Sequence, residues 1–454
     1  MNSTPTFEGL DLDLINPPVT GLDATFDRVI RSSPETLTRA SDDIFLDPDL
    51  SRNPVVLLER LRDRLGYVVP GSGTGFGDLV IPDLFGDTRL GPHFAIFGVD
   101  EMDQVHMDPA SAVNKGAYGT LGESTGMALG QKQGTIPTVE DGAVHDELRA
   151  LYDTVLNHNT MAQRSDKIIE PICNWLIDRI EWKLKHGESV CLCLDLAVPL
   201  TYKALSTMLG VPHEFLSDFV RLGDLFFSSG FQPEAGSAAA NELYGFFLDE
   251  VEKRRVEPRR DLLTYFLKAT LNGVPALSPE AVAITGRFVL IAGIDTTWRQ
   301  LALVMAALLS HPDQFEELCL EPAKLSRKVV EEGLRYAPSG FVVPRRTTKS
   351  LVLGGVSIPA GSHITTYQGI ANRDPRRWDD PDTFDIHRQF KTNRTFGVGV
   401  HSCAGQHLAR LEILTCVQLI AQRLPNLRLT IEPDQLEVRG LQIRVPRTVP
   451  VGLG

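Results

Sequence analysis

The most informative stretch of the chain is Phe396-Gly397-Val398-Gly399-Val400-His401-Ser402-Cys403-Ala404-Gly405-Gln406-His407-Leu408-Ala409-Arg410. It contains one cysteine, Cys403, with glycines at close spacing on both sides, and a run typical of a helix follows over residues 408–424. Only the thiolate form of cysteine binds a metal ion, and the unpaired N–H groups at a helix N-terminus stabilise a thiolate. The glycines let the backbone approach a flat, wide group. The stretch therefore predicts a metal-bound thiolate of the kind that suits haem iron.

The order Phe-Gly-x-Gly-x-His-x-Cys-x-Gly-x-x-Leu-Ala-Arg resembles the haem-ligand signature of the cytochrome P450 family at every fixed position. The resemblance implies a haem b whose iron is bound by Cys403. It also implies that Phe396, Gly397, His401 and Gly405 lie around this cofactor.

Two interpretations of the cysteine without haem remain open. Cys403 could be a buried structural thiol, the ordinary state of a lone cysteine, but this leaves the flanking glycines unexplained. His401, Cys403 and His407 could instead bind zinc, because their spacing permits it. A fourth zinc ligand would have to come from elsewhere in a chain that has no second Cys/His cluster.

Composition and charge narrow the class of protein. The chain has 454 residues, 43% of them hydrophobic, and a net charge of −13 without a block of lysine and arginine, which argues against nucleic acid as a partner. Its longest apolar runs, 288–294 and 301–309, are too short to cross a membrane, and its start lacks the features of a signal peptide. The six cysteines lack the spacing of a disulfide framework. We therefore expect a monomeric, cytoplasmic enzyme that binds no nucleic acid and no membrane.

The local patterns predict a mainly α-helical protein with a smaller β-rich region. Amphipathic spacing predicts a helix over 54–65, and short apolar runs predict strands at 67–69, 79–81 and 94–97. The glycine-rich residues 71–77 have the wrong register for a nucleotide-binding loop and predict a hairpin turn. The family resemblance implies the cytochrome P450 fold.

Two regions show little periodicity. Residues 1–40 are polar and punctuated by proline, and we expect a surface arm there, followed by one domain over 41–454. Residues 110–140 carry several glycines, which predicts a long loop. Loops of that length usually have a function, and a lid is the expected one.

Directly after this loop, His145 and Arg149 stand four residues apart, so they would share one face of a helix. By itself such a pair is typical of a solvated helix edge. In the resembled family, a His-x-x-x-Arg at this place donates hydrogen bonds to a haem propionate, and both residues are expected to bind the cofactor. Arg345 resembles the second propionate-binding arginine of the family, with Arg346 as the alternative.

A long helix is predicted over 278–310, with an interruption in its middle at 292–297. A threonine hydroxyl that bonds a carbonyl one turn earlier opens a helix locally. The segment resembles the oxygen-binding segment of the family, which lies above the iron. The resemblance implies that Ala292 lies on the haem-facing side and that Asp295 and Thr296 are the proton-delivering acid and alcohol.

Two charged pairs stand at helical spacing. Arg299 follows Asp295 by four residues, the favourable order for an ion pair. Glu332 and Arg335 match the Glu-x-x-Arg of the resembled family, a buried structural pair. The family often adds a third, basic partner later in the chain, but Thr383 occupies that position, which leaves the third partner open.

The substrate pocket has no chemical signature of its own. By register with the resembled family, four apolar residues are expected to face it: Phe288, Ile291, Phe341 and Ile443. Any of them could equally be ordinary core. We expect an apolar pocket.

A thiolate ligand pushes electron density towards haem iron and favours O–O cleavage. We therefore expect a haem-thiolate monooxygenase that uses dioxygen to hydroxylate, or otherwise oxidise, a small hydrophobic substrate, with electrons from NAD(P)H through a reductase and a ferredoxin. Four basic residues without a nearby acidic one, Arg388, Lys391, Arg394 and Arg410, predict the ferredoxin-docking face. The alternative is a peroxide-using haem-thiolate peroxygenase, which would not need the pair of Asp295 and Thr296.

Overall fold

The computed structural model describes residues 54–70, 92–118 and 136–454 apart from 213, 214, 228, 230 and 231, together with Arg52. Several sequence predictions lie outside the described residues: the arm over 1–40, the turn over 71–77, the strand over 79–81 and much of the loop over 110–140.

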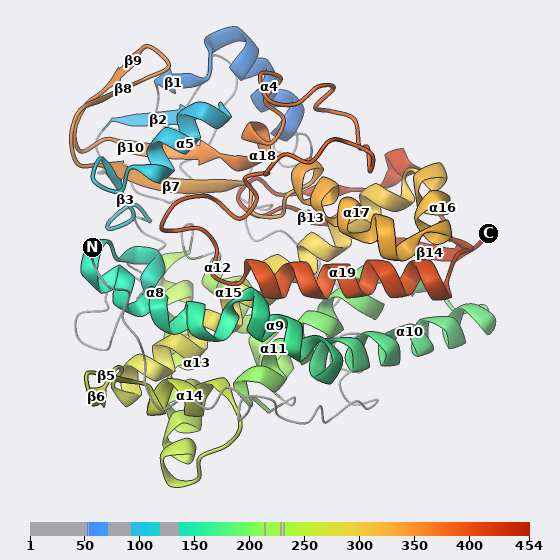
Figure 1. Cartoon of the computed structure of the whole chain (residues 1–454), viewed down its shortest axis with the longest axis horizontal. Coiled ribbons are helices and arrows are strands. Elements are labelled where there is room, and N and C mark those ends of the chain that lie inside the picture. The colour runs from blue at the N-terminus through green and yellow to red at the C-terminus, as the bar shows by residue number, and fades with distance from the viewer. Residues whose placement is uncertain are drawn as a thin grey trace.

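Helices make up most of the protein (Figure 1). They are α4 (Pro54–Leu65), α5 (Val99–Met107), α8 (Gly142–Leu156), α9 (His158–Arg164), α10 (Glu170–Lys185), α11 (Val198–Leu209), α12 (Leu216–Phe227), α13 (Pro233–Val256), α14 (Leu262–Lys268), α15 (Pro279–Leu309), α16 (Pro312–Leu320), α17 (Pro322–Tyr336), α18 (Gln368–Ala371) and α19 (Gln406–Arg423), with short turns η2 (Pro137–Val139), η3 (Ser165–Ile169), η4 (Cys193–Ala197) and η7 (Pro433–Gln435). The predicted helix over 54–65 is confirmed as α4.

The strands gather into one five-stranded sheet and several small ones. They are β1 (Val68–Pro70), β2 (His93–Ile96), β3 (Ala112–Val113), β4 (Val190–Cys191), β5 (Thr270–Leu271), β6 (Val274–Pro275), β7 (Val342–Thr347), β8 (Leu351–Leu353), β9 (Val356–Ile358), β10 (His363–Tyr367), β11 (Leu427–Leu429), β12 (Val438–Arg439), β13 (Val445–Pro446) and β14 (Pro450–Leu453). The five-stranded sheet has the order β1-β2-β10-β7-β3, with β2 and β10 parallel and the other pairs antiparallel. The predicted fold class, mainly α with a smaller β-rich region, is confirmed.

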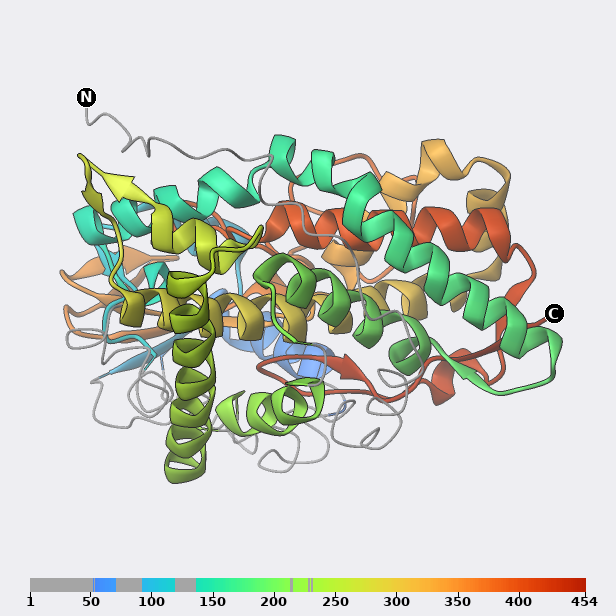
Figure 2. The ribbon, with the colours of Figure 1, turned by 90° about the horizontal axis from the view of Figure 1, so that it is seen from below.

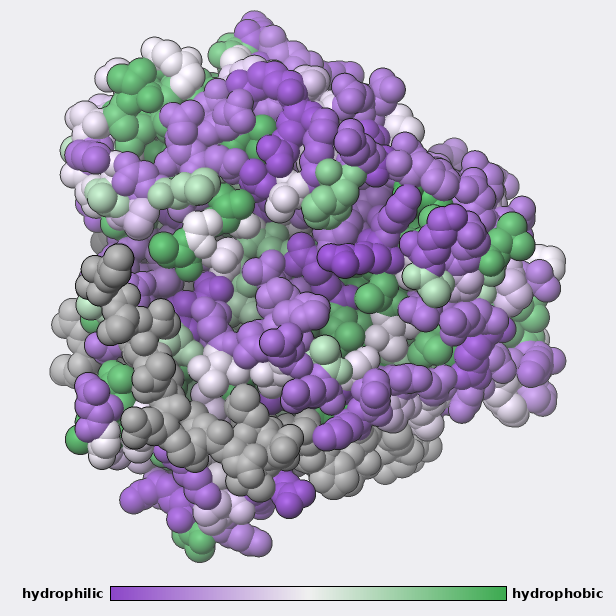
Figure 3. Space-filling model, in the orientation of Figure 1, coloured by the Kyte–Doolittle hydropathy of each residue, from purple (hydrophilic) through white to green (hydrophobic). Residues whose placement is uncertain are grey.

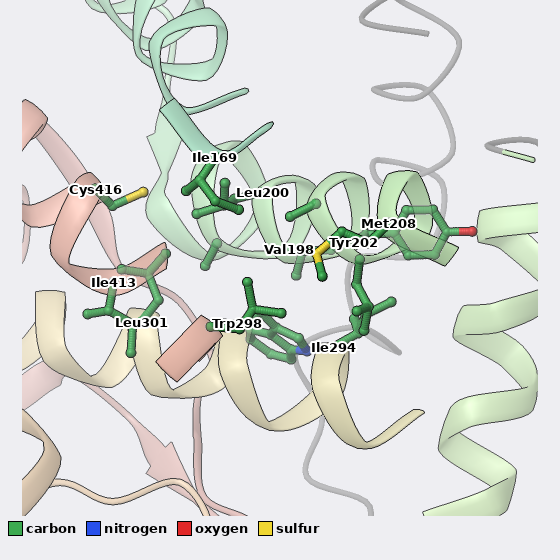
Figure 4. Packing of buried hydrophobic residues seen from close by; sticks show 14 of the residues in the cluster. Ile169, Val198, Leu200, Tyr202, Met208, Ile294, Trp298, Leu301, Ile413 and Cys416 are labelled. Carbon is green, nitrogen blue, oxygen red and sulfur yellow. The ribbon is translucent and has the colours of Figure 1, made fainter. Parts of the chain in front are cut away.

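The core is organised around α15, the longest described helix. Trp298 and Ile294 of α15 face Val198 and Tyr202 of α11, and Ile413 of α19 lies close to the same helix (Figure 4). Figure 2 shows α15 and α19 crossing the molecule side by side. The helix that follows the cysteine loop is therefore packed directly on the core.

Helix α15 is long and apolar enough to cross a membrane by length and composition, but 72% of its most apolar window is buried inside the protein. Burial of that extent is typical of the central helix of a helical protein. Gly286 and Gly293 allow this burial, because a Cβ at either position would lie within 2.7 Å of a neighbouring side chain.

Candidate active site

A loop with left-handed glycines places Cys403 just before α19. Gly397 and Gly399 have φ of +66° and +76°, a region that other residues disfavour. A Cβ on Gly399 would lie 2.3 Å from the carbonyl oxygen of His106 in α5, so only glycine fits this contact. The Cys403 N–H donates to the carbonyl of Phe396 at 2.8 Å and closes the loop. The spacing of the glycines thus reflects the backbone that the loop requires.

The Cys403 thiol lies among protein atoms, yet its side chain keeps accessible surface, so it faces open space rather than packed core. Burial raises the pKa of the thiol, whereas the Gly405 N–H and the guanidinium groups of Arg149 and Arg410 act in the opposite direction. Nearby positive charge favours the thiolate form that binds a metal. The surroundings of the sulfur are those of a ligand rather than of a packing residue.

Helix α8 presents His145 and Arg149 to this loop. His145 is buried, and its Nε2 atom has no hydrogen-bond partner among the described residues. Its ring centroid lies 4.3 Å from that of His401. Arg149 donates to the carbonyl of Val400 at 3.1 Å and also to that of Ser402. Arg149 therefore holds the loop itself, and its predicted bond to a propionate stays a proposal.

A second group of buried donors surrounds Arg345 of β7. Arg345 lies 3.4 Å from Nδ1 of His106, and its burial contrasts with the exposure of Arg346, the alternative. Burial and the charge of Arg345 hold the pKa of His106 well below its usual range. Within the described parts of the chain, Arg345 forms no ion pair with a carboxylate. Burial lowers the pKa of His401, and the nearby Arg345 and His145 act in the same direction. His401 therefore lies near members of both groups.

His401 also binds Asp141, the residue that precedes α8, with 3.0 Å between Nε2 and Oδ1. Asp141 accepts in addition from the backbone N–H groups of Asn114 and Lys115. These bonds hold the pKa of the Asp141 carboxyl below its usual value, although burial acts to raise it. Neither Asp141 nor His106 was identified from sequence, because a single aspartate or histidine at a helix end carries no motif.

Helix α15 brings the predicted oxygen-handling residues together. The Thr296 hydroxyl donates to the carbonyl of Ala292 at 2.9 Å, as expected. The helix nevertheless runs unbroken over Pro279–Leu309, so the predicted interruption is wrong. A carbonyl oxygen has two lone pairs and can accept the hydroxyl as well as its helical N–H. Asp295 accepts from Arg299 at 2.7 Å through Oδ1, and its Oδ2 has no partner among the described residues.

Glu332 and Arg335 of α17 form the buried pair that the sequence predicts, with 2.7 Å between Oε1 and Nη2. The open question of a third partner is answered by Arg388, whose Nε lies 3.2 Å from the same Glu332 oxygen. Arg335 also donates to the carbonyls of Pro381 and Thr383, so Thr383 contributes backbone where the family pattern has a side chain. The pair thus ties α17 to the segment before the cysteine loop.

The four expected pocket residues do not form one group. Phe341 and Ile443 lie together, because Gly340 and Ile443 form a β-bridge, but Phe341 is 1% exposed and packs on Gly369 as core. Phe288 lies edge-on to Tyr152 of α8 with 6.4 Å between ring centroids. Ile291 is buried in the main core. Their contact with a substrate stays a proposal.

Comparison with known proteins identifies the family of this chain. A family model described as Cytochrome P450 matches residues 201–437, more than half of the chain. The chain belongs to the cytochrome P450 family. It is 31% identical to 6-deoxyerythronolide B hydroxylase of Saccharopolyspora erythraea over 69% of this chain and 76% of that enzyme. It is 35% identical to cytochrome P450 107B1 of the same organism over 60% of this chain and 65% of that protein. The expectation of a P450 monooxygenase is confirmed at the level of the family.

Solved structures support the P450 fold over most of the chain. P450BioI in complex with a hexadec-9Z-enoic acid-ligated acyl carrier protein has a TM-score of 0.75 and 25% identity, and the match covers 88% of this chain and 99% of that one. The myxobacterial CYP267B1 in complex with myristic acid has a TM-score of 0.75 and 26% identity over 91% of this chain. The predicted P450 fold is confirmed.

The residues of this P450 fit the haem thiolate that the family implies. Cys403 would supply the single protein ligand. The Nδ1 atom of His145 meets the Asp146 carboxylate at 2.9 Å, but its Nε2 atom has no partner among the described residues, and Arg345 forms no ion pair there, which suits the two propionates of a porphyrin. The zinc alternative is wrong: among the described residues, no three His, Cys, Asp or Glu side chains are arranged to hold a metal ion. His401 faces Asp141, and His407 packs against His158 instead.

Proposed function

We propose that this P450 is a cytoplasmic, monomeric monooxygenase that inserts one oxygen atom of dioxygen into a hydrophobic substrate, with electrons from NAD(P)H. The observation that carries the proposal is that one chain combines Cys403 in its glycine loop with Asp295 and Thr296 on the central helix. The haem, bound through Cys403, would supply the activation and cleavage of dioxygen. The other residues act by binding, orienting and moving protons.

Asp295 and Thr296 are suited to proton delivery. The Thr296 hydroxyl is oriented by its bond to Ala292, and rotation of its single O–H away from that carbonyl would let it donate towards the pocket while it accepts a proton from the other side. The Asp295 carboxylate is held by Arg299 through one oxygen only and is 16% exposed, so its other oxygen is free to accept a proton. Rotation about the Arg299 contact would let this carboxylate exchange protons between solvent and the pocket.

Thr296→Ala is expected to keep haem binding and electron uptake but to divert most of the consumed NAD(P)H into hydrogen peroxide, because protons then reach the reacting oxygen without orientation. General acid–base groups contribute about 10²- to 10⁴-fold in rate, so the loss of product should fall in that range. The measurement is the ratio of product to peroxide per NAD(P)H. Asp295→Asn should slow turnover and enlarge the solvent isotope effect, with less peroxide than Thr296→Ala.

The same experiment distinguishes the monooxygenase from the alternative, a peroxygenase. A peroxide-using enzyme does not deliver protons to dioxygen, so Thr296→Ala would remain fully coupled and added hydrogen peroxide would support turnover at the rate of the wild type. That outcome would replace the monooxygenase proposal. The orientation of Thr296 and the free oxygen of Asp295 favour the monooxygenase.

The predicted docking face needs correction. Arg388 pairs with Glu332, Arg394 pairs with Asp103, and Arg410 pairs with Glu331. Lys391 donates to the carbonyl of Arg377 at 2.6 Å. The basic residues that lie close together in the sequence are therefore largely neutralised within the fold, because their acidic partners come from segments distant in the chain.

A different basic surface lies beside α17. A groove of about 530 Å³ is lined by Arg327, Lys328, Lys391 and the exposed Phe390, among others. Arg327 and Lys328 are exposed and form no ion pair with the described residues, and hydrophilic side chains dominate the surface around α17 and α19 (Figure 3). Since α17 packs on α19, which follows Cys403, we propose this groove as the site for an acidic ferredoxin.

Reversal of both free charges, Arg327→Glu with Lys328→Glu, is expected to slow reduction by an acidic ferredoxin about tenfold or more at low salt and to flatten its salt dependence. Stopped-flow reduction at several ionic strengths measures both. The matched control is Arg259→Glu with Arg260→Glu, two exposed arginines just before α14, a helix that lies far from α17 in Figure 1. Equal slowing by the two double variants would show that net charge, not the groove, governs docking.

A further inference from the structure

A buried arginine in the N-terminal third of α15 has no carboxylate partner for its charge among the described residues. Arg287 is 5% exposed. Its Nη1 donates to the carbonyl of Ala240 in α13 at 3.0 Å, and its guanidinium lies 5.9 Å from the ring centroid of Phe226 in α12. No aspartate or glutamate of the described chain forms an ion pair with it. The guanidinium thus sits at the junction of three helices, near one carbonyl, the Phe226 ring and Tyr244 of α13, which favours its charged form.

Other buried arginines of this P450 show what a purely structural role looks like. Arg254 is held by Glu250 and Asp261, and Arg335 by Glu332, so each charge is neutralised inside the fold. These pairs compensate much of the cost of removing a cation from water. Arg287 has no such compensation.

Arg164 and Arg345 are buried without a carboxylate partner too, and each has a reason. Arg164 donates to the carbonyl of Val155 in the last turn of α8, where helix carbonyls lack N–H partners. Arg345 lies in the donor group proposed to meet the haem propionates. Ala240, the acceptor of Arg287, is in the middle of α13, so its carbonyl already has a helical N–H. Arg287 caps no helix end and lies outside the proposed propionate group, so neither of these two reasons applies to it.

The charge of Arg287 is retained despite its burial. Burial lowers its pKa to about 10, so the guanidinium stays protonated near neutral pH. An isolated buried charge is expensive, and such groups normally occur with a counter-ion. A substrate anion that enters this junction would supply it with charge-assisted hydrogen bonds.

An independent observation lies on the same face of α13. Ser229 is fully buried, and its hydroxyl has no hydrogen-bond partner among the described residues. It packs on Gly236, where an added Cβ would lie 2.0 Å from the Ser229 Cβ. Gly236 and Ala240 are one helical turn apart, so the free hydroxyl of Ser229 and the guanidinium of Arg287 approach neighbouring positions of α13. Together they offer one hydroxyl without a partner and one cation without a carboxylate among the described residues.

We propose that this junction binds the carboxylate of the substrate, so that this P450 acts on amphipathic acids; the inference deepens the proposed function and rests on it. Arg287 precedes Asp295 by eight residues, about 12 Å along the helix axis. The carbon that is oxidised would therefore lie about 12 Å from the carboxylate, in the apolar part of the substrate. The expected substrate is therefore apolar except for one carboxylate at its end.

The test compares dodecanoic acid with dodecanamide, which has nearly the same shape without the charge. Calorimetric titration of the haem-loaded enzyme, with the haem spin state as a second readout, gives both dissociation constants. A charge-assisted hydrogen bond corresponds to about a 10- to 100-fold change in affinity, so the wild type should prefer the acid by that factor. Arg287→Met should remove the preference and leave the affinity for the amide within about twofold. Arg287→Lys should restore part of it.

A structural role for Arg287 predicts the opposite pattern. Replacement of an uncompensated buried charge by an apolar side chain of similar volume is often neutral or stabilising, so we expect the Tm of Arg287→Met to be unchanged or higher. The matched control is Arg164→Met, which should lower Tm and leave the acid preference intact. A wild type that binds acid and amide equally, or binds the acid undetectably, overturns the proposal. An equal loss for both ligands in Arg287→Met, together with a lower Tm, also overturns it.

Both readouts are independent of turnover. If the carbon monoxide spectrum of the wild type lacked a thiolate signature while the acid preference persisted, the proposed monooxygenase activity would fail and the anion site would stand. The reverse result would leave the monooxygenase standing without this substrate class.

Discussion

Replacement of Cys403 by histidine is expected to abolish monooxygenation and to remove the red-shifted Soret band of the reduced, carbon monoxide-bound protein. Histidine can still bind haem iron, so the variant should retain haem, but a neutral imidazole does not push electron density as a thiolate does. The loop favours this outcome, because the Gly405 N–H and two arginines lie near the position of the sulfur. The spectrum of the reduced protein with carbon monoxide measures the result directly.

The control for this experiment is another cysteine. Cys416 lies within α19, the helix that follows Cys403. It is fully buried, and its sulfur is 3.4 Å from that of Cys173. Cys416→Ala should preserve the thiolate signature, since its neighbours are apolar core rather than a cofactor loop. Survival of the signature in Cys403→His would mean that a different cysteine is the ligand.

Arg335→Ala is expected to produce the largest loss of stability among single substitutions in this P450. Arg335 and Glu332 are 1% and 5% exposed, so the variant would leave the Glu332 carboxylate buried with Arg388 as its remaining cation. Removal of one partner from a buried pair typically costs about 3–5 kcal/mol in the free energy of unfolding. Because Arg335 also holds the carbonyls of Pro381 and Thr383, we expect haem retention to fall as well.

Denaturant unfolding, with haem absorbance as a second probe, measures both effects. Arg327→Ala on the exposed face of the same helix is the matched control and should change the free energy of unfolding by less than about 0.5 kcal/mol. The double variant Glu332→Leu with Arg335→Met should recover part of the loss, because it removes both charges and leaves neither one unpaired. A cost below about 1 kcal/mol for Arg335→Ala would show that Arg388 alone neutralises Glu332.

Short-range features of the chain could be predicted from sequence because their causes are local. The glycines around Cys403 are required by backbone conformation within a few residues, and Gly397 and Gly399 do adopt left-handed φ. The bond from Thr296 to Ala292 and the ion pair of Asp295 with Arg299 follow from the geometry of one helical turn. The interruption of α15 failed as a prediction, because a helix buried on most sides is held by its packing even where its sequence is weak.

The amino-acid order alone therefore determined the glycine loop around Cys403, the polar pair on the central helix and the mainly helical class, all of which depend on neighbours in sequence. Only the tertiary structure decided which charges are free. Arg394 meets Asp103 and Arg388 meets Glu332 across long separations in the chain, which removed the predicted docking face, while Arg287 meets no carboxylate in the described structure. Charge compensation depends on distance in space, which folding sets, and for this reason a count of charges along the sequence could not reveal it.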